Sequence, residues 1–158
     1  MTSTHLHLLI THLPIFDSML GAIVLLIGIW NKSNTTKIAA YTLFVISSIG
    51  AGIAYLSGEG AEESVEEIQG VIESTIELHQ NAALLSLVAL IFLGFISLIA
   101  IYLTSIKSSL INLFAFLILV CSLMSFVLVA RTGYLGGKIR HTEIDNSSNS
   151  SSDKDLDD

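Results

Sequence analysis

Five histidines are the side chains of this sequence with the greatest capacity to bind a metal ion or a haem: His5, His7, His12, His79 and His141. Neutral imidazole is a ligand for haem iron and for zinc, copper and non-haem iron. The first three lie in "HLHLLITHLP", directly before a long apolar run, and the other two lie far along the chain. Whether these imidazoles can share a ligand depends on the elements that carry them.

The elements available are apolar helices long enough to cross a membrane. Hydrophobic residues make up 52% of the 158 residues, charged residues only 13%, and the mean hydropathy is +0.73. A span needs roughly 20 mostly apolar residues, and it must be helical because lipid offers the backbone no hydrogen-bond partners. Such runs extend from about His5 or Ile15 to Trp30, from Ile38 to Leu56, from Asn81 to Leu103 and from Leu110 to Ala130. We predict an all-α fold, a four-helix transmembrane bundle over residues 1–144 that lies in a lipid bilayer.

The connection between the second and third spans is acidic, with glutamates from Glu59 to Glu77. Its pattern predicts a short acidic helix after Gly60, a break at Gly70 and a second helix that continues into the third span. On that second helix His79 shares one face with apolar residues at helical spacing. We therefore expect His79 to point into the bundle.

Four crossings place both termini and the acidic connection on one membrane face, and all five histidines with them. The short loops of the other face, "NKSNTTK" and "TSIKSS", carry Lys32, Lys37 and Lys107 and no acid. The positive-inside rule makes that face cytoplasmic, although three cations after the fourth span weaken the bias. We expect a multi-pass membrane protein, with both termini and the histidine cluster on the side opposite the cytoplasm.

A carboxylate lies near the start of the first span. Asp17, Gly21, Val24 and Gly28 follow one another at helical spacing, which puts Asp17 on a stripe of small residues where a neighbouring helix can approach. A carboxylate at the membrane edge is a functional candidate with a nearby histidine or Arg131 as its partner. The alternative is an interfacial aspartate favoured by the helix dipole.

The end of the fourth span carries three glycines within "RTGYLGGKIRHTEI", residues 131–144. Glycine commonly ends helices, so we expect the chain to fold back there and bring Arg140, His141 and Glu143 over the mouth of the bundle. The alternative is a flexible exit. Residues 145–158 are polar and acidic without aromatic residues, which predicts a disordered acidic tail.

The sequence resembles a family of small bacterial four-span membrane proteins known as a domain of unknown function. The resemblance rests on "THLPIF", on "YLSGEGAEESVEEIQGVIESTIELHQNAAL" and on "RTGYLGGKIRHTEI", and it covers about residues 5–144. Gly60 and Gln69 depart from it, since relatives often have proline there, and so does Gln80, where they often have an acid. Related domains are sometimes fused to c-type cytochrome segments, so the resemblance implies electron transfer. The family pattern carries over His12, Pro14, Gly58, Glu59, Glu62, Glu63, Glu66, Gly70, Glu73, Glu77, His79, Gly136, Gly137, Arg140, His141 and Glu143.

The first hypothesis for the site is haem b, which would serve electron transfer. Bundle cores hold haem through side chains of facing helices, and we expect His12 and His79 as the axial ligands. His141 or Arg140 would meet a propionate or exchange roles with the ligands. The attachment motif C-x-x-C-H is absent from the sequence, so such a haem would be bound non-covalently.

The second hypothesis is a non-haem iron, copper or zinc ion held by histidines and carboxylates. No local spacing of the H-E-x-x-H type fixes its ligands. The candidate ligands are His12, His79, His141, Glu59, Glu62, Glu66 and Glu143. Asp17, Glu63, Glu73 and Glu77 would surround them and orient the imidazoles.

The third hypothesis is a non-catalytic membrane subunit that binds a basic or redox protein partner through its acidic segment on the outer face. Nucleic acid is excluded as a partner because that segment would repel phosphates. No serine lies in a recognisable nucleophile elbow, so nucleophilic hydrolysis is not indicated. The oligomeric state is left open by the sequence.

Overall fold

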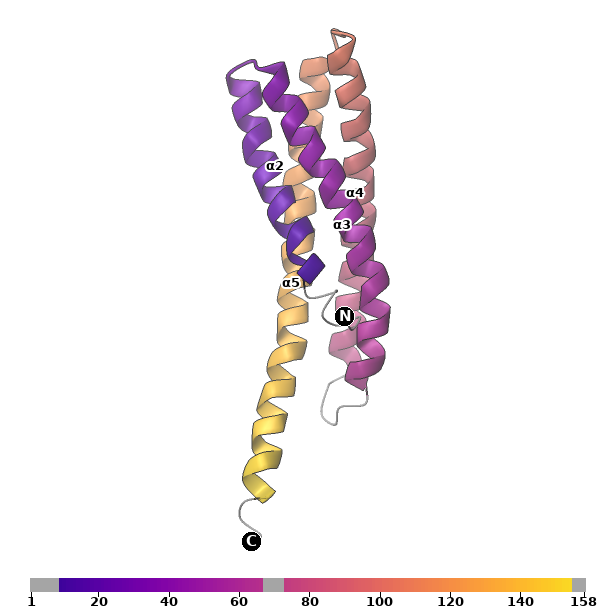
Figure 1. Ribbon diagram of the computed structural model, residues 1–158, viewed down its shortest axis with the longest axis vertical. Coiled ribbons are helices and arrows are strands. Elements are labelled where there is room, and N and C mark those ends of the chain that lie inside the picture. Colours follow the sequence, from indigo (N-terminus) through magenta and orange to yellow (C-terminus); the bar gives the residue numbers. More distant parts are fainter. Residues whose placement is uncertain (1–8, 67–72, 155–158) are drawn as a thin grey trace.

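The computed structural model describes residues 9–66 and 73–154, with side chains for residues 9–58 and 76–138. Its helices are α2 (His12–Trp30), α3 (Asn34–Glu66), α4 (Glu73–Ser105) and α5 (Ile111–Lys154) (Figure 1). All four are long and apolar enough to cross a membrane, over His12–Trp30, Asn34–Gly58, Ile76–Ser105 and Ile111–Lys138. The predicted all-α bundle of four spans is therefore confirmed.

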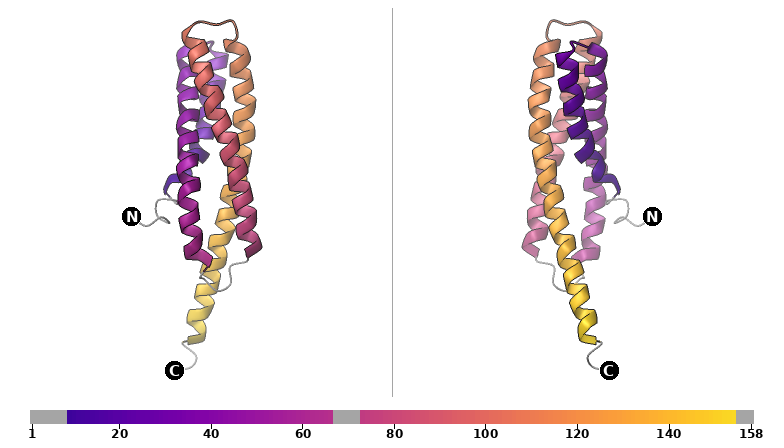
Figure 2. Two further views of the ribbon diagram at one scale, coloured as in Figure 1. Left: turned by 90° about the vertical axis from the view of Figure 1, so that its right-hand side faces the viewer. Right: turned by 90° about the vertical axis from the view of Figure 1, so that its left-hand side faces the viewer.

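The four helices form a square in cross-section. Helix α2 packs against α3 and α5, and α4 packs against the same two helices (Figure 2). Helices α2 and α4 therefore occupy diagonal corners. Large apolar side chains such as Leu26, Phe92 and Phe116 face outward, as a lipid-facing surface requires, while much of the interior consists of serine and alanine.

Small residues allow the helices to approach closely. A Cβ added at Gly21 would lie 2.5 Å from Cε1 of Phe44, and one added at Gly94 would lie 2.6 Å from Cβ of Ser48. Gly28 meets α3 in the same way, since its added Cβ would lie 2.9 Å from the backbone nitrogen of Lys37. The predicted stripe along α2 is thus a packing surface, because only glycine leaves room for these contacts.

Both short loops are built alike. After α2, Lys32 adopts φ 52°, and Ser33 N–H donates to the Gly28 carbonyl at 3.0 Å. After α4, Lys107 adopts φ 54°, and Ser108 N–H donates to the Leu103 carbonyl at 3.0 Å. These are Schellman motifs with a left-handed lysine where glycine is usual. They end α2 and α4 and let α3 and α5 begin within a few residues.

The acidic connection differs from the predicted separate helix. Helix α3 continues without a break from its span to Glu66 and includes Gly60 within it. Glutamate and alanine are good helix formers, and an existing helix propagates more easily than a new one nucleates. The predicted break at Gly70 lies outside the described residues. Helix α4 runs from Glu73 into the third span without interruption, as predicted.

The predicted fold-back at the end of the fourth span is wrong. Helix α5 passes through the three glycines and continues to Lys154, projecting beyond the other helices (Figures 1 and 2). Two of these glycines provide space for a neighbour instead of ending the helix, since Gly133 faces Ile15 and Gly136 faces His79. Helix α5 includes residues 145–154 as its last turns, since an existing helix extends more easily than a new one nucleates. The disorder expected for residues 145–158 stays a prediction.

Candidate functional site

His79 lies on α4, half-buried against α5. Its Nδ1 is 3.1 Å from the backbone carbonyl oxygen of Thr132. A carbonyl oxygen can only accept a hydrogen bond, so Nδ1 carries the proton and donates it. In the neutral ring Nε2 therefore bears the lone pair. The contact between α4 and α5 thus selects the tautomer that a metal-binding imidazole needs at Nε2.

Gly136 provides the space for this ring. A Cβ added at Gly136 would lie 3.2 Å from Cε1 of His79, 3.5 Å from Nδ1 and 3.9 Å from Nε2. The imidazole therefore packs directly against the backbone of α5, one turn after its hydrogen-bond acceptor Thr132. A larger side chain at Gly136 would require the ring to shift.

A second contact between the same helices lies two turns along α4. The Oγ atoms of Ser86 and Thr132 are 2.9 Å apart, and Thr132 Oγ1 donates to the Leu128 carbonyl at 3.1 Å. Because the Thr132 proton is used in that bond, Ser86 is the donor to Thr132. His79 and Ser86 thus both bond to Thr132 of α5, His79 to its backbone carbonyl and Ser86 to its hydroxyl. Neither Ser86 nor Thr132 was predicted. Ser86 could have been found from its spacing, because residues seven apart share a helix face with His79, but no local pattern points to Thr132.

His12 is placed differently. It is the first residue of α2, its side chain is exposed, and its ring stacks with that of Phe16 one turn later, with centroids 6.4 Å apart. Helix α2 is diagonal to α4, so the described contacts do not join His12 to His79. The pairing of these two histidines as ligands stays a prediction.

Asp17 lies one turn further along α2 and is partly exposed. Across residues 9–58 and 76–138, neither it nor the exposed Arg131 forms an ion pair. The position fits the alternative of an interfacial carboxylate better than a charge pair. Its neighbour Ser18 is fully buried and donates to the Ile15 carbonyl at 3.0 Å.

The other candidate ligands lie on the helix ends. Glu77 is exposed on α4. Among the side chains that the structure describes, no group of three or more histidines, cysteines or acids could hold a metal ion. The side chains of the remaining candidates lie outside that part: Glu59, Glu62, Glu63 and Glu66 on α3, Glu73 on α4, and Arg140, His141 and Glu143 on α5.

Comparison of this chain with protein-family models, curated proteins and solved structures gave no match. The resemblance to the four-span family therefore stays a prediction. Among the described residues, His79 combines three features of a metal-binding imidazole. Its Nδ1 donates to a backbone carbonyl, the lone pair of the ring is on Nε2, and a glycine lies beside the ring.

Proposed function

We propose that this protein binds a redox cofactor, haem b before other candidates, through Nε2 of His79, and that it serves electron transfer at the membrane. The observation that carries the proposal is the 3.1 Å hydrogen bond from Nδ1 to the Thr132 carbonyl. Metal-bound histidines nearly always donate their other ring N–H to a carbonyl or carboxylate, which fixes the ring and raises the basicity of the ligating nitrogen. His79 has that partner in place.

The position of His79 between two helices also supports the proposal. Its ring, carried by α4, packs against Gly136 of α5. Haem in a helical bundle is held between helices by histidine ligands. Bound haem would supply an iron that passes one electron at a time. His12 or His141 would be the second histidine that holds the haem, and Arg140 would pair with a propionate.

Two observations favour other candidates at the same end. The glutamates of α3 and α4 gather where these helices extend past the start of α2 (Figure 1), and carboxylates with imidazole suit non-haem iron. The same acidic extensions offer a surface for a basic protein partner. The family resemblance suggests a bacterial inner membrane, and we place this end on its periplasmic side because the other end of the bundle carries Lys32, Lys37 and Lys107.

The test is the absorption spectrum and metal content of the full chain purified from haem-replete cells. We expect a Soret band and b-type peaks in the reduced-minus-oxidised spectrum. His79→Asn is the decisive variant, because the asparagine amide can replace the Nδ1–H donor to Thr132 but offers no counterpart of Nε2. It should lose the haem while the protein stays folded, and His12→Ala tests the second ligand.

Gln80→Ala is the matched control, since it alters the next, exposed residue of α4 and should keep the spectrum. Metal without haem, lost in His79→Asn, would support the non-haem candidate instead. A preparation without haem or metal, or one whose spectrum survives His79→Asn, would refute the ligand role of His79.

A further inference from the structure

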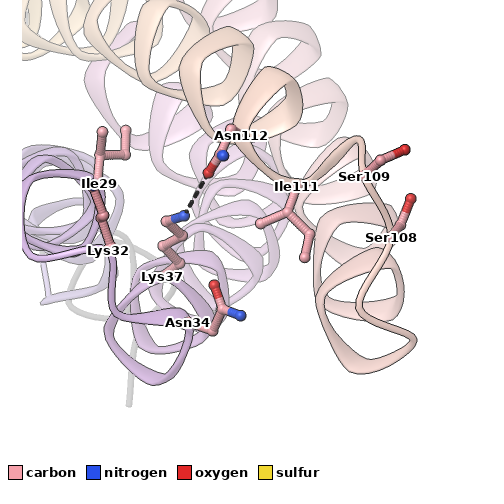
Figure 3. Close-up of a pocket in the computed structure, with 8 residues that line it drawn as sticks. All are labelled: Ile29, Lys32, Asn34, Lys37, Ser108, Ser109, Ile111 and Asn112. Atoms are coloured by element: carbon pink, nitrogen blue, oxygen red, sulfur yellow. Dashed lines mark hydrogen bonds between the residues drawn. The ribbon is translucent and has the colours of Figure 1, made fainter.

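The end of the bundle opposite His79 contains a pocket of about 470 Å³. It lies where α2 turns into α3 and α4 turns into α5, and two isoleucines form its apolar part (Figure 3). Its polar lining consists of Lys32, Asn34, Lys37, Ser108, Ser109 and Asn112. All of these residues carry hydrogen-bond donors, and none is an acid.

Lys37 is the central feature of this pocket. Its side chain is only 3% exposed, and its Nζ reaches from α3 to Asn112 Oδ1 on α5 at 3.0 Å (Figure 3). The aliphatic part of the Lys37 side chain packs against α2, since a Cβ added at Gly28 would lie 3.1 Å from Lys37 Cγ. The ammonium is therefore held in place, and its direction is set by packing.

No acidic side chain of residues 9–58 and 76–138 neutralises the charge of Lys37. Among the described residues it forms no ion pair, and its side-chain partner is a neutral amide. An ammonium has three donor positions, of which Asn112 uses one. Burial of a cation is costly unless it is paired with an anion and hydrogen-bonded. A ligand that brings a negative charge and acceptor oxygens would complete this arrangement.

The charged residues near the pocket also favour an anion. Residues 31–37 and 104–112 contain Lys32 and Lys107 besides Lys37 and no aspartate or glutamate. Helices α2 and α4 end here, at Trp30 and Ser105, and α3 and α5 begin here, at Asn34 and Ile111, so the negative and positive ends of the helix dipoles largely offset one another. The lysines therefore determine the sign of the local field, and that field favours an anion.

We propose that this pocket binds a phosphate group, either the phosphodiester of an anionic lipid headgroup or a free phosphate. Hydroxyl and amide donors beside an ammonium match the oxygens of phosphate. The volume lies in the range of about 300–1,000 Å³ of ligand pockets and leaves room for a substituent on the phosphorus. Basic pockets at the ends of membrane helices lie at headgroup level. This inference is independent of the cofactor proposed at His79.

The experiment titrates the delipidated full chain in a neutral detergent with three probes: dioctanoyl phosphatidylglycerol, dioctanoyl phosphatidylcholine and inorganic phosphate. Native mass spectrometry or calorimetry measures each dissociation constant. We expect saturable binding of phosphatidylglycerol or of inorganic phosphate, weakened about tenfold or more in Lys37→Met, because a buried charge-assisted hydrogen bond is lost. Lys138→Met, an exposed lysine at the other end of the bundle, is the matched control and should leave binding unchanged.

Ser109→Asp is a second variant that leaves the buried lysine in place, and it should weaken binding by placing a negative charge in the pocket. Preferential binding of phosphatidylglycerol over phosphatidylcholine, with no binding of inorganic phosphate, identifies the lipid as the source. Saturable binding of inorganic phosphate that both variants weaken identifies a free phosphate. Absence of anion binding, or anion binding that neither variant weakens, would overturn the proposal.

Discussion

Gly136 and Gly137 form a matched pair that tests the contact between His79 and α5. Both lie within α5, so replacing either with alanine should bring the same gain in helix propensity, about 1 kcal/mol. Their surroundings differ: a Cβ at Gly137 meets nothing within 4 Å, whereas one at Gly136 lies 3.2 Å from Cε1 of His79. Gly137→Ala should therefore raise the free energy of unfolding by about 1 kcal/mol.

Gly136→Ala should stabilise less, or not at all. At 3.2 Å the imidazole must move by a few tenths of an ångström, and the displacement weakens its hydrogen bond to the Thr132 carbonyl. A net hydrogen bond contributes about 0.5–1.5 kcal/mol, which is enough to cancel the gain in propensity. The two alanine variants are thus expected to differ by about 0.5–1.5 kcal/mol in unfolding free energy.

A double-mutant cycle assigns that difference to His79. The free energies of unfolding are measured by denaturant titration in mixed micelles, followed by circular dichroism, for both alanine variants in the native and the His79→Ala backgrounds. Without the ring, Gly136→Ala should stabilise as much as Gly137→Ala, so the coupling energy is the cost of the contact. Equal stabilisation by both variants in the native background, or a difference that persists without the ring, would refute this account of Gly136.

Three further predictions concern packing, and each is read from thermal unfolding of the purified chain. Tyr41→Phe should leave the stability unchanged or raise it. The buried hydroxyl has no hydrogen-bond partner within the described part of the chain, and burial of an unpaired hydroxyl is costly. Marked destabilisation would show that the hydroxyl is hydrogen-bonded. Gly21→Val should destabilise the protein by about 1–3 kcal/mol, because the new side chain would collide with Phe44. Gly52→Ala is its control and should not destabilise the protein, since its added Cβ meets no atom within 4 Å. Equal effects of the two substitutions would contradict the close approach of Gly21 to Phe44. Lys107→Gly should stabilise by relieving a left-handed φ of 54°, by up to about 1 kcal/mol; a loss of stability would mean that the lysine side chain matters more than the backbone.

The spans could be predicted from the sequence because hydropathy and length alone determine which segments cross lipid. The role of the glycines in α5 could not. The same residue type ends a helix in one context and admits a neighbour in another, and only the packing partner decides between them. For Gly136 that partner is His79, 57 residues earlier in the chain, and no local pattern connects the two.

The sequence predicted which way His79 faces but not the residues that it contacts. Helical periodicity indicated that His79 faces the bundle, and the structure places it against α5. Periodicity cannot identify the facing residue, so Thr132 and Ser86 were missed. The pairing of His12 with His79 stays a prediction. These residues lie on α2 and α4, which occupy diagonal corners of the bundle, and periodicity does not show which corners two helices occupy.

Lys37 contributes both to the predicted orientation of the chain in the membrane and to the proposed anion pocket. For topology it counts as a loop cation, together with Lys32 and Lys107. In the structure it is buried, because Gly28 lets α2 come so close that an added Cβ would lie 2.9 Å from the Lys37 backbone nitrogen. Lys32 and Lys107 remain exposed in the loops, so replacement of Lys37 should leave the orientation of the chain in the membrane intact. Loss of anion binding in Lys37→Met without inversion of the termini would therefore separate the pocket from the topology signal.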